Sequence, residues 1–141
     1  MSTNKLRIVL DTNVFLVAIP EKSPYHLIYK SFRAHAFDLF VSTEILMEYE
    51  EVFAEKLGYE RTALMLPELL NLHSIHLTTT YFKWNLIPED PDDNKFVDCA
   101  IAANADYIVT NDRHFNILKQ IKFPVVVTIK ASEFLELLPA L

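Results

Sequence analysis

The chain contains few of the residues that build linkers, disulfides or membrane spans. Its 141 residues include one glycine and one cysteine, which excludes a disulfide framework and a zinc site built on cysteines. No apolar run approaches the roughly 20 residues that cross a bilayer, and the first residues lack the pattern of a signal peptide. We therefore expect a single domain over residues 1–141, without a membrane segment, in the reducing cytoplasm.

An excess of positive charge is also missing. The chain has 13 Lys and Arg against 19 Asp and Glu, and its formal net charge is −6. Domains that bind nucleic acid by charge alone are usually basic, so a simple DNA- or RNA-binding module is disfavoured. A metal-dependent nuclease remains compatible with this charge, because a bound cation would neutralise several of the acids.

Short apolar runs alternate with longer segments of helical spacing along the chain. The short runs predict buried strands at residues 6–10, 37–41, 105–110 and 125–129. Strands that alternate with helices favour an α/β domain with three layers, α/β/α, and a mainly parallel central sheet.

The helix boundaries are predicted from their capping residues. Ser23 is expected to cap a first helix, Ser42 or Thr43 a second and Ser132 the last. A helix over residues 60–73 is expected to be interrupted near Pro67, because proline lacks the backbone N–H that a helix interior needs.

Acidic residues stand where predicted strands end or predicted helices begin. Asp11 and Asp112 each follow a strand, and Asp93 opens the helix that leads into the second of these strands. Because the carboxyl ends of parallel strands meet at one edge of a sheet, these three carboxylates should meet there. Glu48 lies in the second turn of a helix, and helical side chains tilt toward the helix N-terminus, so it should point to the same edge.

Carboxylates that converge in this way repel one another unless a cation lies among them. Mg²⁺ and Mn²⁺ prefer oxygen ligands and share them with phosphates. Such ions activate water for displacement at phosphorus, so the pattern is typical of phosphodiester hydrolysis. The alternative is that the acids at helix starts are only caps.

Four segments of the chain together resemble the motifs of one nuclease family. Asp11-Thr12-Asn13 follows a strand, and the other segments are residues 41–49, 92–96 and 105–112. Their order and spacing, over about residues 6–115, resemble the PIN-domain nucleases, many of which are toxin ribonucleases of type II toxin–antitoxin pairs. The resemblance implies a PIN-like fold and cleavage of RNA.

The resemblance also assigns residues and partners. It implies Mg²⁺ or Mn²⁺ held by Asp11, Glu48, Asp93 and Asp112. It implies hydrogen-bond support of the site by Asn13, Ser42 and Thr110. A homodimer and an antitoxin protein encoded elsewhere are further implications. Separately, Lys95 and Arg113 flank the acids and are candidates for contact with RNA phosphate.

Some assignments have close competitors. Asp92 competes with Asp93 as a ligand. Asp98 lies five residues after Asp93, about 140° around a helix, so both side chains cannot point the same way, and we expect Asp98 to support the site from behind. The five histidines show no ligand spacing, and none is predicted as a ligand, although His114 is near the acids.

Two other functions compete with the nuclease. One is a non-catalytic interaction module that keeps the PIN fold. The other is a different Mg²⁺-dependent phosphoryl hydrolase. A haloacid-dehalogenase-type phosphatase would need an acid two residues after Asp11, where the chain has Asn13, and a receiver domain would need an acidic pair before Asp11, which is lacking.

Overall fold

One parallel sheet organises the chain. The computed structural model describes residues 5–140, so residues 1–4 and 141 of the expected domain lie outside the described residues. All strand pairs are parallel, and the strand order is β3-β2-β1-β4-β5. The strands are β1 (Arg7–Leu10), β2 (Asp38–Val41), β3 (Ile75–Leu77), β4 (Tyr107–Val109) and β5 (Thr128–Ile129).

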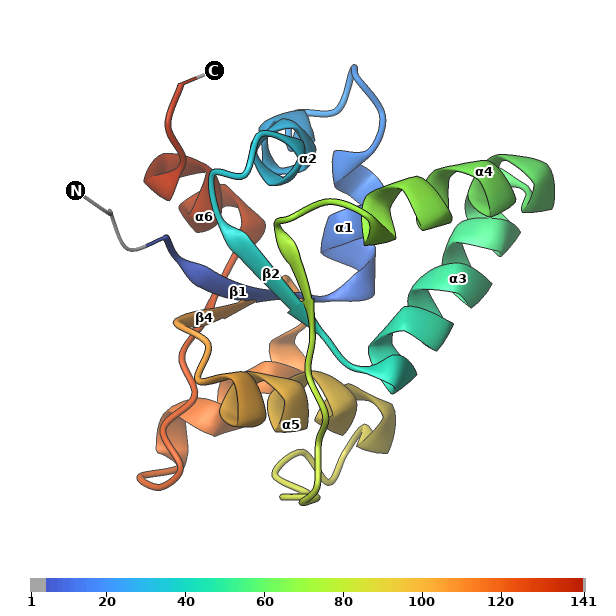
Figure 1. The fold of residues 1–141 in the computed structure, drawn as a ribbon. Helices are drawn as coiled ribbons and strands as arrows, with labels where there is room; N and C mark the ends of the chain where they lie inside the picture. Colours follow the sequence, from blue (N-terminus) through green and yellow to red (C-terminus); the bar gives the residue numbers. More distant parts are fainter. Residues whose placement is uncertain (1–4, 141) are drawn as a thin grey trace.

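Helices cover both faces of this sheet. Figure 1 shows α1, α2 and α6 on one side of the strands and α5 on the other, which confirms the predicted three-layer α/β/α class. The α-helices are α1 (Thr12–Ala18), α2 (His26–Arg33), α3 (Thr43–Leu57), α4 (Tyr59–Leu70), α5 (Asn94–Ala103) and α6 (Ala131–Leu137). Two 3₁₀ helices are η1 (Pro91–Asp93) and η2 (Arg113–Gln120). Within residues 5–140, no helix is both long and apolar enough to span a membrane.

The sheet brings the ends of β1 and β4 together at its centre. Leu10, the last residue of β1, pairs with Val109, the last residue of β4. On its other side β1 pairs with β2, so the chain first builds β2 and β3 on one side of β1 and then crosses over to build β4 and β5 on the other side. Such a switch point opens a crevice at the carboxyl ends of the strands, which is where ligands bind in open parallel sheets.

Aromatic packing fixes α3 beside this edge. The ring of Phe15 in α1 meets Tyr49 and Phe53 of α3 edge-on, with centroid distances of 5.1 and 5.3 Å. The Tyr49 hydroxyl donates a hydrogen bond to the carbonyl oxygen of Leu10 at 2.6 Å. This contact holds α3 against the end of β1, and Tyr49 is the residue after Glu48.

Several predicted helix boundaries need correction. Ser42 caps α3 as predicted, because its Oγ accepts the N–H of Ile45 at 3.3 Å. The prediction for Ser23 was wrong: its Oγ accepts from the N–H of Tyr25 within a turn, and α2 begins only at His26. The last helix is preceded by Lys130 rather than by Ser132.

One predicted helix interruption and one predicted strand also differ from the structure. α4 runs through Pro67 without a break. Pro67 and Ala63, whose carbonyl loses its helical donor, are both exposed, so water can satisfy that carbonyl. The predicted buried strand at residues 125–129 is reduced to the two residues of β5, and Val125 is 73% exposed.

Candidate functional site

One hydroxyl group joins the acids that follow β1 and β4. The N–H of Asp11 donates to the carbonyl of Val109 at 3.0 Å, so the ladder continues into the site. The Thr110 hydroxyl donates to Asp11 Oδ2 at 2.7 Å and accepts the N–H of Asp112 at 3.0 Å. Asp11 is only 7% exposed. Thr110 therefore fixes both acids at the carboxyl edge of the sheet, and Asp11 is the more deeply placed of the two.

The start of α5 adds Asp93 and a second acid, Asp90. Asp93 is the N-cap residue of α5 but makes no side-chain capping hydrogen bond in the described chain, and its side chain is 13% exposed. The loop before it is held by Asn94, whose amide group bonds to the backbone N–H and carbonyl of Ile87 at 2.9 and 3.0 Å. This clamp fixes the segment that carries Asp90 beside the site.

His114 completes this group. Asp112 Oδ1 accepts the backbone N–H of His114 at 2.9 Å, which turns the chain so that the imidazole faces the acids. One ligand atom from each of Asp90, Asp93, Asp112 and His114 lies within 4.8 Å of the others. Asp90 and His114 were missed from the sequence, because neither follows a strand or shows ligand spacing.

The acids influence one another through space. Burial, together with the carboxylates of Asp90, Asp112 and Asp11, raises the pKa of Asp93 from 3.8 to about 7, against a lowering by His114. Burial also raises the pKa of Asp11, and the nearby Asp112 and Glu48 carboxylates add to the rise. A site of this kind gains stability from a cation.

Glu48 reaches the same edge but stands apart from the four-residue group. Its Oε2 accepts a hydrogen bond from the Thr12 hydroxyl, and its Oε1 pairs with Lys95 Nζ at 2.6 Å. Asn13, for which the family resemblance implies a supporting role, is exposed, and the hydrogen bond to Glu48 comes from its neighbour Thr12. The side chain of Lys95, which is predicted to contact phosphate, is 16% exposed and forms an ion pair with Glu48.

Three further candidate residues lie around the site without contacting the four-residue group through a hydrogen bond of their side chains in the described chain. Ser42 Oγ serves α3 as its cap. Asp92 is exposed and lines a surface hollow with Glu48 and Lys95, on the α3 side of the site. Arg113 is exposed and borders Asp112.

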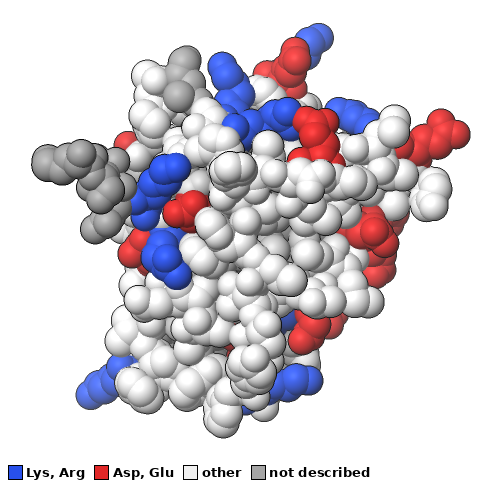
Figure 2. All heavy atoms as spheres, in the orientation of Figure 1, with Lys and Arg blue, Asp and Glu red and all other residues white. Residues whose placement is uncertain are grey.

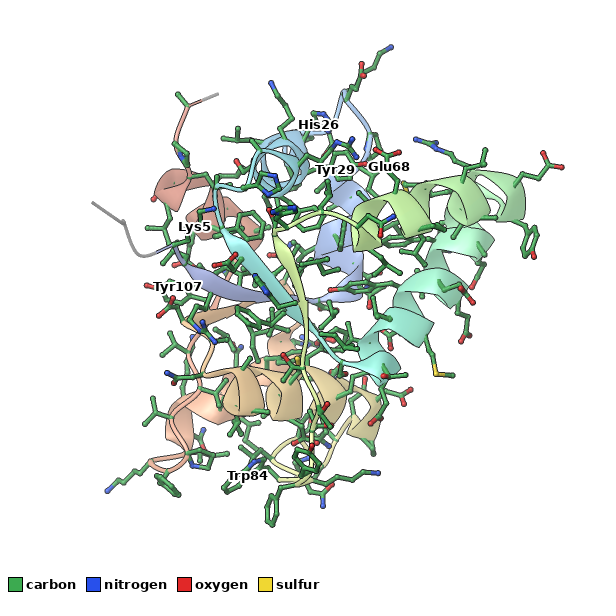
Figure 3. All side chains as sticks on the ribbon, viewed as in Figure 1. Lys5, His26, Tyr29, Glu68, Trp84 and Tyr107 are labelled. Atoms are coloured by element: carbon green, nitrogen blue, oxygen red, sulfur yellow. The ribbon has the colours of Figure 1, made fainter. Side chains whose placement is uncertain are left out.

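The carboxylate of Asp98 binds the backbone of a loop. Its Oδ1 accepts the backbone N–H of Trp84 at 3.0 Å. Figure 3 shows Trp84 beyond α5, on the side of that helix away from the sheet, whereas Tyr107 marks the amino end of β4 opposite the site. Asp98 thus tethers the segment that runs on to Asp90.

Two atoms of the site lack the hydrogen bonds that their burial demands. Asp93 Oδ2 and His114 Nδ1 are shielded from solvent and have no hydrogen-bond partner among the described residues. Buried polar atoms are nearly always satisfied, so such orphans require an explanation. A divalent cation bound between the carboxylates would satisfy both atoms, and the oxygen-rich donor set suits one.

Comparison with known proteins agrees with this arrangement. A family model described as PIN domain matches residues 7–114. A solved structure of VapBC2 from Rickettsia felis, bound to a DNA fragment from its promoter, superposes with a TM-score of 0.62 at 19% identity, covering 89% of this chain and 98% of that one. DNA-bound VapBC from Salmonella typhimurium gives 0.60 at 21% identity, with the same coverage. A search of curated sequences returned no match.

The fold is a parallel α/β domain, and its acidic site lies at the carboxyl edge of the sheet, at the topological switch point. Because the family model spans most of the chain, the protein belongs to the PIN-domain family. The predicted family resemblance is confirmed.

Proposed function

We propose that the chain is a divalent-metal-dependent endoribonuclease that hydrolyses RNA phosphodiester bonds. The observation that supports this most strongly is the grouping of Asp93 and Asp112, with Asp11 held beside them through Thr110. We assign the metal-binding and catalytic roles to Asp11, Glu48, Asp93 and Asp112. Mg²⁺ and Mn²⁺ are the ions that suit these oxygens.

The chain's own residues prepare the site for this chemistry. When bound, a divalent ion would polarise a phosphate oxygen and lower the pKa of a bound water. Thr110 keeps Asp11 and Asp112 in fixed orientations through its two hydrogen bonds. Thr12 and Lys95 hold Glu48 at the other side, so Glu48 is oriented before substrate arrives.

The cations that border the acids are the candidates for substrate contact. On the face of the molecule in Figure 2, Lys and Arg lie toward the margins. Arg113 lines a hollow of about 220 Å³ that includes Thr110 and Asp112 and also Lys119 and Lys130. In the described part of the chain none of these three cations forms an ion pair with an acid. We assign this hollow to a phosphate of the RNA next to the cleaved bond.

The Arg113→Ala variant tests that assignment. We expect RNA affinity to fall about tenfold and the slope of log affinity against log salt to shrink by about one, because one phosphate contact is lost. Filter binding of RNA across a salt series measures both quantities. Arg61→Ala, an exposed arginine of α4, is the matched control and should leave them unchanged. An unaltered salt slope in Arg113→Ala would place the phosphate elsewhere.

We also propose that the chain is the toxin of a type II toxin–antitoxin pair. The similar solved structures are, by their titles, VapBC2 and VapBC bound to DNA, and an apolar hollow of about 390 Å³ between α3 and α4 offers a surface for a protein partner. We extend the proposal to a homodimer in the cytoplasm. Co-expression with the product of a neighbouring gene, followed by size-exclusion chromatography, tests the partner and the oligomeric state.

The nuclease proposal is tested on the purified chain. We expect it to cleave single-stranded RNA internally with added Mg²⁺ or Mn²⁺ and to lose this activity with EDTA. A DNA of the same sequence and a small phosphomonoester are the comparison substrates. Turnover of the phosphomonoester alone would favour another phosphoryl hydrolase. No cleavage, together with no thermal stabilisation by Mn²⁺, would favour a non-catalytic interaction module.

A further inference from the structure

The imidazole of His114 faces three carboxylates at once. His114 Nδ1 lies 3.2 Å from Asp112 Oδ1, 3.8 Å from Asp90 Oδ2 and 3.9 Å from Asp93 Oδ2. The backbone fixes this position, because the N–H of His114 is bound by the side chain of Asp112. The ring nitrogen is therefore directed at the same point as the acids.

This nitrogen has no hydrogen bond, although oxygen acceptors surround it. His114 Nδ1 and Asp93 Oδ2 are both buried at the atom level and unpartnered among residues 5–140. The four ligand atoms lie within 4.8 Å of one another, so these residues would be able to hold one divalent ion together.

We propose that His114 Nδ1 and Asp90 join Asp93 and Asp112 as metal ligands, and that this mixed nitrogen and oxygen set selects Mn²⁺ over Mg²⁺. The inference rests on the proposed function, since it concerns the same metal site. It adds two ligands that the family-based assignment did not include, and it names the ion.

The preference follows from the chemistry of the donor atoms. Mg²⁺ is a hard ion that takes oxygen ligands and gives up its waters reluctantly, so an imidazole adds little to its binding. First-row transition ions accept imidazole nitrogen readily, and Mn²⁺ also accepts carboxylates. A site that has a histidine among its acids therefore gains more affinity for Mn²⁺ than for Mg²⁺.

His114 could instead act only as a positive counter-charge to the acids. In that arrangement the ring would form ion pairs with the carboxylates that face Nδ1. Glu89 Oε2, which lies 3.9 Å from Nε2, would be a further partner. Ion pairing and ligation predict different results, because only ligation bonds a nitrogen to the metal.

The experiment compares three variants with the wild-type chain. His114→Phe keeps a ring without nitrogen, and His114→Asp replaces the nitrogen by an oxygen ligand. His76→Phe is the matched control, since His76 pairs with Asp38 at 2.9 Å at the amino end of β2, far from the site. Calorimetric titration gives the Kd of Mn²⁺ and of Mg²⁺, and pulsed electron paramagnetic resonance of bound Mn²⁺ detects coupling to ¹⁴N.

We expect ¹⁴N coupling in the wild-type chain and in His76→Phe, and its loss in both His114 variants. In His114→Phe the Kd of Mn²⁺ should rise about tenfold or more, with a smaller change for Mg²⁺. In His114→Asp the two ions should bind with more similar affinities than in the wild type. Absence of ¹⁴N coupling in the wild type, or an unchanged Mn²⁺ to Mg²⁺ ratio in His114→Phe, would overturn the proposal.

These readouts separate the inference from the proposed function. If the chain cleaves no RNA but shows ¹⁴N coupling and the Mn²⁺ preference, the ligand assignment stands and the nuclease proposal fails. If RNA is cleaved and the coupling is absent, the nuclease proposal stands and His114 is not a ligand.

Discussion

Replacing Asp11 by Asn should lower the rate of RNA cleavage by about 100-fold or more while the fold remains intact. Asp11 is buried behind the acidic group, and its charge acts on Asp93. A metal ion supplies several kcal/mol of charge stabilisation in the transition state, and each ~1.4 kcal/mol corresponds to a factor of ten. The amide oxygen of Asn can still accept the hydrogen bond from Thr110, so the local structure should persist.

The measurement is single-turnover cleavage of a labelled RNA, with circular dichroism as a check on folding. Asp38→Asn is the matched control, because Asp38 begins β2 at the opposite end of the strands and pairs with His76. The control should cleave at the wild-type rate. Undiminished cleavage by a folded Asp11→Asn variant would remove Asp11 from the site and contradict the proposed mechanism.

The sequence sufficed for the positions of acids that follow strands. Asp11 comes directly after a short buried run, and Asp112 follows another with one residue between. Because the two strands pair in parallel, both acids lie at the same edge of the sheet. The helix α5 runs antiparallel to β4, which follows it, so Asp93 at the start of α5 lies at the same edge as the end of β4. These positions depend on the alternation of strands with helices, and the order of apolar segments along the sequence shows that alternation.

The sequence did not suffice where side-chain direction or loop course decides the contact. Thr12 and Asn13 are neighbours, and only the start of α1 determines that Thr12 turns toward Glu48. Asp90 reaches the site because Asn94 clamps the loop at Ile87, a contact between polar groups that leaves no periodic signal. His114 is oriented by the hydrogen bond that its backbone N–H donates to Asp112 Oδ1.

Lys95 and Asp98 illustrate the same limit on α5. Lys95 was predicted to contact phosphate because it flanks the acids, and the role of Asp98 was predicted from its angle to Asp93 around the helix. The ammonium group of Lys95 extends to Glu48 on α3, and the carboxylate of Asp98 extends to the backbone of Trp84. Which of several polar partners a long or half-buried side chain selects depends on packing between helices, and a single sequence does not specify it.

Replacing Asp93 by Asn should raise the melting temperature of the metal-free chain at pH 8 and abolish its stabilisation by Mn²⁺. Burial and the neighbouring Asp90, Asp112 and Asp11 carboxylates raise the pKa of Asp93 from 3.8 to about 7. At pH 8 the wild-type chain carries this repelled charge and the variant does not. We expect a gain of at least about 3 °C in the absence of metal.

The sign of the pH dependence follows from the direction of this shift. The folded chain holds the Asp93 proton more tightly than the unfolded chain, so raising the pH from about 4 to 8 removes stability from the wild type. The Asp93→Asn variant has no such proton to lose. The advantage of the variant should therefore be small near pH 4, grow through pH 7 and level off above it.

With Mn²⁺ bound, the wild-type chain should have a higher melting temperature than Asp93→Asn, the reverse of the order expected without metal. At a Mn²⁺ concentration 100 times Kd, binding adds about 2.7 kcal/mol of stability, which corresponds to roughly 10 °C for a domain of this size. The wild-type chain should show this increase, and Asp93→Asn should show little of it, while Asp38→Asn keeps it in full. Differential scanning fluorimetry at pH 4, 6, 7, 8 and 9, with and without Mn²⁺, measures all of these quantities. If Asp93→Asn melts below the wild type in EDTA at pH 8, the carboxylate contributes to folding without a cation, and the electrostatic argument for a metal between these acids loses its basis.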